Sequence, residues 1–183
     1  MSLLGHARMM AGLALVSLPA AAWAELAVGG KAPTFSTTGA HSGQVFAFNL
    51  RQALKKGPVV LYFYPKAFTQ GCTLEANAFA EAMADFDAAG ATVIGLSADD
   101  LPTLKRFSIE ECRGKFPVAT ASKVVIEAYD VALHREGQAT GLSNRTSYVI
   151  GMDGRVKLAY SDMDWRQHVK LTLAKVRELQ RQK

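Results

Sequence analysis

The hydrophobic residues of this chain gather in a few continuous runs, separated by stretches in which they recur at helical spacing. The clearest run, PVVLYFY at residues 58–64, is β-branched and aromatic almost throughout. Such a run is typical of a strand that is buried on both faces of a sheet. ATVIGLSAD at residues 91–99 predicts a second buried strand, and FPVAT at residues 116–120 predicts a short one.

Helical spacing follows the buried strands. Between residues 72 and 89 the apolar positions recur every three or four residues until Gly90 ends the run. Residues 101–113 predict a second helix, with Pro102 in its first turn, and residues 122–130 a brief third one. A long amphipathic helix is expected from Trp165 to the C-terminus.

Two further stretches read as paired strands. Residues 31–50 are rich in turn residues and suggest a hairpin or short strands, and residues 145–160 form two strands joined at Asp153-Gly154. The resulting order of elements predicts an α/β fold with a mixed central sheet and helices on both faces. This order is compatible with a thioredoxin-like fold, but the pattern alone does not single that fold out.

The first 24 residues carry the features of a secretory signal. Arg8 is followed by an apolar run from Met9, and Ala22-Trp23-Ala24 is a small-x-small cleavage site. A membrane anchor needs about 20 unbroken apolar residues, and Pro19 interrupts this shorter run. A buried N-terminal helix is the alternative. We expect cleavage before Glu25, export to a bacterial periplasm, and no stable membrane association.

The composition and charge of the chain limit the classes of function that fit it. Residues 25–183 contain no repeat and no linker, so we expect a single domain. The formal net charge of +5 is spread along the chain, and its basic C-terminal tail reads as a solvated helix end, so no nucleic-acid partner is expected. The histidines form no cluster with metal-ligand spacing, and no stretch demands a cofactor or a metal.

The chain has only two cysteines, and Cys72 occupies an unusual place. It follows the buried strand across a short loop and begins the next helix. At a helix N-terminus, free N–H groups and the helix dipole favour an anion, and the thiolate is the reactive form of cysteine. Pro65 fixes the exit from the strand and shields the site, and the Thr69 hydroxyl can turn towards the sulfur. For a cysteine without these neighbours, a buried and inert thiol is more common than a nucleophile.

Pro65, Thr69 and Cys72, in the spacing Pro-x-x-x-Thr-x-x-Cys, resemble the active-site signature of the peroxiredoxins. The stretch YFYPKAFTQGCTLEA is similar to the bacterioferritin-comigratory-protein, or PrxQ, branch of that family. VGGKAPTF near the start and RTSYVIGMDGRV near the end extend the resemblance over nearly all of residues 25–183.

The resemblance implies a thioredoxin-like fold that reduces hydroperoxides and is recycled by a thioredoxin-like or other thiol reductant. Cys72 would be the peroxidatic thiolate and become a sulfenic acid. Thr69 Oγ1 and the Arg145 guanidinium would hydrogen-bond the peroxide, Arg145 would also stabilise the thiolate, and Glu75 would orient Arg145. Alternatively, Arg145 is a surface arginine and Glu75 merely complements the helix dipole.

The chain also departs from the family pattern. Asn77 stands where many members of this branch carry a second cysteine, and Gln70 replaces a proline common in the loop. Cys112, near the end of the predicted helix at residues 101–113, is then the candidate resolving thiol that would form a disulfide with Cys72. The alternative is that Cys112 has no redox role and an external thiol reduces the sulfenic acid. We expect a monomer, with a weak dimer as the alternative.

Two other functions compete. One is an exported thiol–disulfide oxidoreductase, but such enzymes normally use C-x-x-C, and Thr69 and Glu75 occupy the positions three residues on either side of Cys72. The other is a non-enzymatic peroxide sensor or binding module with a Cys72–Cys112 disulfide. Rapid catalytic consumption of hydroperoxide separates the peroxidase from both.

Overall fold

The computed structural model describes residues 26–182. The predicted signal segment and its cleavage site lie outside the described residues. The elements in chain order are β1 (Ser36–His41), β2 (Gln44–Asn49), α1 (Leu50–Leu54), β3 (Val59–Phe63), α2 (Gln70–Ala88), β4 (Thr92–Ser97), α3 (Leu101–Glu110), β5 (Val118–Thr120), α4 (Lys123–Ala128), β6 (Ala132–Arg135), β7 (Gln138–Ser143), β8 (Thr146–Ile150), β9 (Val156–Ser161), the 3₁₀ helix η1 (Trp165–Gln167) and α5 (His168–Arg181).

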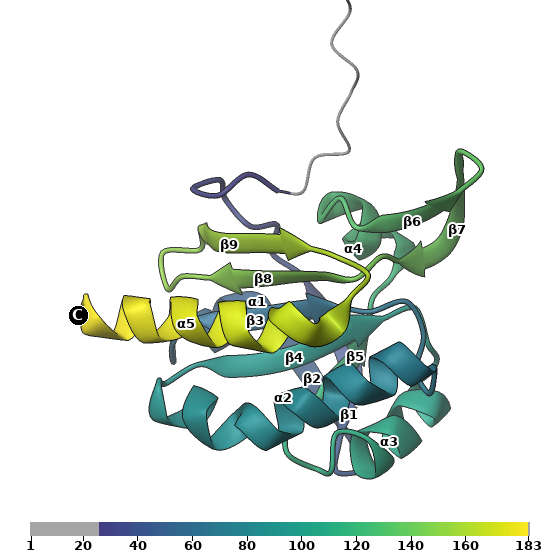
Figure 1. Cartoon of the computed structure of the whole chain (residues 1–183), viewed down its shortest axis with the longest axis horizontal. Helices are drawn as coiled ribbons and strands as arrows, with labels where there is room; N and C mark the ends of the chain where they lie inside the picture. Colours follow the sequence, from purple (N-terminus) through teal and green to yellow (C-terminus); the bar gives the residue numbers. More distant parts are fainter. Residues whose placement is uncertain (1–25, 183) are drawn as a thin grey trace, which may run out of the picture.

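A seven-stranded mixed sheet with the strand order β2-β1-β5-β4-β3-β8-β9 forms the centre of the molecule. Strands β3, β4 and β5 run parallel, whereas β8 pairs with β3, and β1 with β5, in antiparallel fashion. In Figure 1, α2 and α5 lie side by side in front of this sheet. The mixed sheet confirms the predicted fold class.

The side chains of β3 show why the strand is apolar throughout. Val60 and Tyr62 point into the core beneath α2, α3 and α5, while Val59, Leu61 and Phe63 point into the core beneath α1 and α4. All five side chains are fully buried. Because parallel strands covered on both faces bury every side chain, the continuous hydrophobic run was a reliable signal.

The predicted elements are confirmed with small shifts of their ends. The hairpin in residues 31–50 is β1–β2, and the strands joined at Asp153-Gly154 are β8–β9. The predicted C-terminal helix begins with the 3₁₀ turn η1 before α5. The helix predicted for residues 101–113 ends at Glu110, because Arg113 and Gly114 adopt positive φ angles of 51° and 64° and close it.

Two elements were missed by the sequence analysis. The five-residue helix α1 is too short to show a helical period, although Asn49 caps it by accepting a hydrogen bond from Gln52 N–H. The hairpin β6–β7 extends away from the main sheet and is mostly exposed, so it lacks an alternating apolar pattern. Its turn residues Glu136 and Gly137, both with positive φ, were the available signal.

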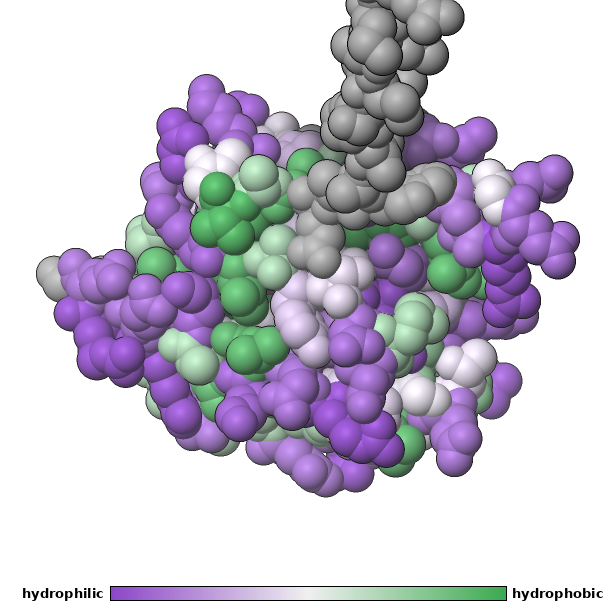
Figure 2. Space-filling model, turned by 45° about the horizontal axis from the view of Figure 1, so that its top comes forward, coloured by the Kyte–Doolittle hydropathy of each residue, from purple (hydrophilic) through white to green (hydrophobic). Residues whose placement is uncertain are grey.

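The face shown in Figure 2 is dominated by hydrophilic residues, which divide the hydrophobic ones into several small groups. Within residues 26–182, no helix is both long enough and apolar enough to span a membrane.

Candidate active site

Cys72 lies in the first turn of α2, at the edge of the sheet where the parallel strands β3 and β4 end. The loop between β3 and α2 carries Pro65, which is half-buried, and Thr69, which is exposed and precedes the helix. Cys72 itself is only 1% exposed. The carboxyl edge of a parallel sheet is where open α/β folds hold their ligands, so the thiol is placed where the sequence predicted it.

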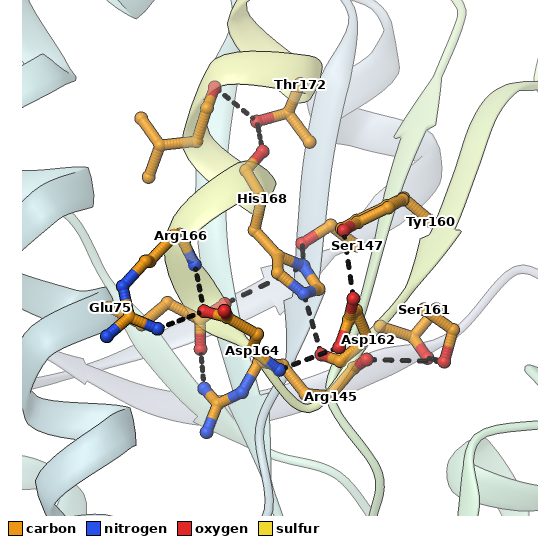
Figure 3. A network of polar contacts seen from close by, with 12 residues as sticks. Glu75, Arg145, Ser147, Tyr160, Ser161, Asp162, Asp164, Arg166, His168 and Thr172 are labelled. Atoms are coloured by element: carbon orange, nitrogen blue, oxygen red, sulfur yellow. Dashed lines mark hydrogen bonds and ion pairs between the residues drawn. The ribbon is translucent and has the colours of Figure 1, made fainter.

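Arg145, immediately before β8, brings a positive charge to the thiol. Its Nη2 lies 3.5 Å from Cys72 Sγ, and its Nη1 pairs with Glu75 Oε2. Glu75 follows Cys72 by three residues and so lies on the same face of α2. Figure 3 shows the Glu75 and Arg145 side chains directed towards each other. The predicted group of Cys72, Glu75 and Arg145 is therefore assembled.

Arg145 reaches this position over a glycine. A Cβ added at Gly71 would lie 3.1 Å from Arg145 Nη2, tighter than ordinary van der Waals contact. The φ angle of Gly71 is not in the left-handed region. A glycine is therefore required here by the close approach of Arg145 and not by the backbone conformation.

Burial raises the pKa of the Glu75 carboxyl above its ordinary value, and Arg145 acts in the opposite direction. Burial by itself would lower the pKa of Arg145, but Glu75 and Cys72 outweigh it and raise that pKa. Each partner therefore stabilises the charge of the other. A fixed guanidinium beside the sulfur stabilises negative charge on the thiol or on an atom bound to it.

Thr69 is placed differently from the expectation. Its hydroxyl donates to the Lys66 carbonyl at 2.9 Å, within the loop, rather than to Cys72, and it makes no capping hydrogen bond to α2. The hydroxyl oxygen keeps its capacity to accept, since donating uses only its hydrogen.

Several polar groups that hold the site were missed by the sequence analysis. Asp99 Oδ2 accepts from Ala67 N–H in the active-site loop at 2.7 Å, and Ser143 Oγ donates to the Tyr64 carbonyl at 2.8 Å. Asp99 lies two residues after the end of β4, and a polar residue just beyond a buried strand was a usable signal. The Met163 carbonyl accepts from Arg145 Nε at 3.0 Å, and a backbone acceptor leaves no signal in the sequence.

Cys112 is fully buried in the turn after α3, and its backbone N–H donates to the Phe107 carbonyl. Both thiols lie in the same core cluster and are reduced. Tyr62 belongs to the same cluster; burial raises its pKa, and negative charge on Cys112, Tyr64, Glu75 and Cys72 acts in the same direction. Cys72 enters this core from α2, and Cys112 enters it from the end of α3.

Asn77, which stands where many members of the resembled branch carry a second cysteine, connects these two helices. Its Nδ2 donates to the Thr73 carbonyl at 2.9 Å and to Glu111 Oε2 at 3.1 Å, next to Cys112. In the described part of the chain, no three His, Cys, Asp or Glu side chains are grouped so that they could hold a metal ion.

Comparison with known proteins agrees with this geometry. The AhpC/TSA family model matches residues 28–159. Peroxiredoxin Bcp of Escherichia coli is 30% identical over 122 residues, covering 66% of this chain and 78% of the relative. The chloroplastic peroxiredoxin Q of Suaeda salsa is 37% identical over 111 residues, covering 59% of this chain and 49% of that protein.

Among solved structures, peroxidoxin BcpB of Mycobacterium tuberculosis superimposes with a TM-score of 0.73 at 28% identity, covering 83% of this chain and 97% of that chain. The residues that the family model matches include Cys72, Glu75 and Arg145. This chain therefore belongs to the AhpC/TSA family and is a peroxiredoxin of the Bcp/PrxQ branch, a peroxidase of the oxidoreductase class.

Proposed function

We propose that the chain reduces hydrogen peroxide and organic hydroperoxides through Cys72. The observation that carries the proposal is the 3.5 Å contact between Arg145 Nη2 and Cys72 Sγ, backed by Glu75. A buried guanidinium with its own carboxylate behind it has a fixed direction, as stabilisation of a developing charge requires.

In the proposed reaction the Cys72 thiolate attacks one peroxide oxygen and the O–O bond breaks. The sulfur is oxidised to sulfenic acid, and the other oxygen leaves as water or an alcohol after taking up a proton. Arg145 stabilises the charge on the leaving oxygen, and Thr69, whose oxygen can still accept, binds the peroxide proton. Pro65 keeps bulk water from the sulfur.

The sulfenic acid is then resolved by Cys112. The Cys112 sulfur attacks the Cys72 sulfur, a disulfide forms, and the oxygen leaves as water. A dithiol reductant of the thioredoxin type restores both thiols by exchange and is itself oxidised to a disulfide.

A peroxide-consumption assay on residues 25–183 with excess thiol reductant tests the proposal. The wild type should turn over, and Cys72→Ser should lose all turnover, because an alcohol cannot supply a comparable anion near neutral pH. Stoichiometric oxidation without turnover would support the sensor instead. Thiol–disulfide exchange without peroxide consumption would support the oxidoreductase.

The proposed location is outside the cytoplasm, with Glu25 as the mature N-terminus, and the proposed state is a monomer. The features of residues 1–24 support export. N-terminal sequencing of protein from fractionated cells should give Glu25 in the periplasmic fraction. An intact Met1 in the cytosol would contradict export, and sedimentation at micromolar concentration would separate monomer from dimer.

A further inference from the structure

His168, the first residue of α5, is fully buried behind the group formed by Cys72, Glu75 and Arg145, and the proposed function gives it no role. Its Nδ1 lies 3.8 Å from Glu75 Oε1, and its ring packs edge-on against Tyr160 at 4.8 Å between centroids. Figure 3 shows the imidazole between the Ser147 side chain and the Asp162–Asp164 turn.

Both ring nitrogens are engaged. Nε2 lies 2.9 Å from the Asp162 carbonyl oxygen, and Nδ1 lies 2.9 Å from Ser147 Oγ. A carbonyl oxygen only accepts, so Nε2 carries the proton, and in a neutral ring Nδ1 accepts from the Ser147 hydroxyl. The surroundings therefore select one tautomer.

The ring is neutral near pH 7. Burial lowers the pKa of His168 to about 4, and Arg145 acts in the same direction, while Asp162 and Asp164 oppose it. A protonated ring would present an N–H at Nδ1 towards Glu75 Oε1 and compete with Arg145 for that carboxylate. The neutral imidazole leaves the carboxylate to Arg145.

The Asp162 carbonyl belongs to the turn that also holds Arg145. The next carbonyl, that of Met163, accepts from Arg145 Nε at 3.0 Å, and Asp162 N–H donates to the Arg145 carbonyl at 3.2 Å. Nε2–H of His168 thus fixes the turn from α5, and the turn holds the guanidinium at Nε while Glu75 holds it at Nη1.

We propose that His168 is a positioning residue for peroxide reduction: its neutral imidazole holds the Asp162–Met163 turn, so that the Met163 carbonyl keeps the Arg145 guanidinium against Cys72. This inference rests on the proposed function, since the reaction it supports is the attack of Cys72 on peroxide.

Two substitutions separate the ring's two hydrogen bonds. In His168→Gln the amide nitrogen occupies roughly the place of Nε2 and can still donate to the Asp162 carbonyl. In His168→Asn the shorter amide reaches only the place of Nδ1, so that the bond to the turn is lost. We expect His168→Asn to lower the rate constant with hydrogen peroxide by about three- to tenfold, the range that one hydrogen bond corresponds to, and His168→Gln to stay within about twofold of the wild type.

A second readout does not depend on peroxide. In a Cys112→Ser background, the rate of alkylation of Cys72 by iodoacetamide at pH 7 reports the thiolate that Arg145 stabilises, and it should fall in His168→Asn but not in His168→Gln. If the wild type consumes no peroxide, the proposed function fails while this readout still tests His168.

Thr172→Val is the matched control. The Thr172 hydroxyl is also buried on α5 and donates to the His168 carbonyl at 2.7 Å, but it does not touch the turn. Both rates should be unchanged in this variant. Equal losses in His168→Asn and His168→Gln, or no loss in either, would overturn the proposal. If His168→Asn does not fold, His168→Leu, which fills the space but has no donor for the Asp162 carbonyl, should show the same losses; unchanged rates there would also overturn the proposal.

Discussion

Arg145 decides the chemistry at the scale of single residues. Replacing it by alanine removes the only guanidinium that contacts the thiol among the described residues, and we expect the rate constant with hydrogen peroxide to fall by two orders of magnitude or more. The rate constant of Arg145→Lys should lie between those of the wild type and Arg145→Ala, because an ammonium keeps the charge but loses the planar fork. Stopped-flow measurement of the first oxidation gives these rates.

Arg145→Ala also leaves the buried Glu75 without its partner, which by itself destabilises a protein by roughly 3 kcal/mol. The double variant Arg145→Met, Glu75→Gln removes both charges and should recover much of that stability but none of the rate. Arg177→Ala, an exposed arginine paired with Asp85 on the surface, is the control and should react like the wild type. Recovery of the rate in the double variant would contradict the role of Arg145.

Gly71→Ala separates activity from stability. The added methyl group would lie 3.1 Å from Arg145 Nη2, so the guanidinium has to move by a few tenths of an ångström, and the rate with peroxide should fall several-fold. Stability should stay equal or rise by up to about 1 kcal/mol, since alanine is the better helix former. Gln70→Ala in the same turn is exposed and should leave both unchanged. An unchanged rate in Gly71→Ala would contradict the close approach.

The sequence predicted the residues of the site better than their contacts. Cys72, Glu75 and Arg145 come together as expected, because helical spacing and strand order place them at one edge of the sheet. The Thr69 hydroxyl bonds within its own loop, and the Met163 carbonyl and His168 hold Arg145 from a distant turn. None of these three contacts follows a sequence period or a motif, so only the folded backbone reveals them.

At the scale of elements, the start of α2 and the end of α3 control the second half of the proposed cycle. A disulfide requires Cα atoms within about 7 Å and sulfurs at about 2 Å. Cys72 is held by the first turn of α2, and Cys112 by the turn that Arg113 and Gly114 close. Both cysteines are buried and reduced, so we expect one or both helix ends to unwind locally before the sulfurs meet.

One equivalent of peroxide should therefore give a monomer without free thiols and a Cys72–Cys112 peptide in mass spectrometry. Cys112→Ser should still react once, stall as sulfenic acid and over-oxidise more readily. Asn77→Ala, which frees Glu111 next to Cys112, should speed disulfide formation without changing the first oxidation. Undiminished turnover of Cys112→Ser with a thioredoxin-type reductant would make this a one-cysteine enzyme.

The elements that the sequence analysis found are those whose side chains form the hydrophobic core. The buried strands β3 and β4 and the amphipathic helix α2 bury continuous or periodic apolar residues, so their patterns survive in the sequence. The hairpin β6–β7 was missed because it is mostly exposed and carries no such pattern, although it delivers Ser143 and then Arg145 to the site.

At the scale of the whole molecule, the buried polar network makes the stability of the fold depend on pH. His168 contacts Glu75 from α2, Ser147 from β8, Tyr160 from β9 and the Asp162 carbonyl. The charges of Arg145 and Asp164 also act on it. Its pKa in the folded protein, about 4, lies below the ordinary value of 6.5. Between these pH values the unfolded chain binds a proton at this position that the folded chain does not.

The stability that His168 contributes is therefore fully present above pH 6.5 and is lost as the pH falls towards 4, by up to about 3 kcal/mol. Urea unfolding at pH 7, 5.5 and 4.5 should show a steeper loss on acidification in the wild type than in His168→Gln, which cannot take up the proton. Glu75 and the other acidic groups are present in both proteins, so their titration largely cancels in the difference. Thr172→Val keeps the imidazole and should run parallel to the wild type. Parallel curves for the wild type and His168→Gln would mean that folding does not shift the pKa of His168, and a shallower loss in the wild type would mean that the buried imidazole already carries its proton at neutral pH.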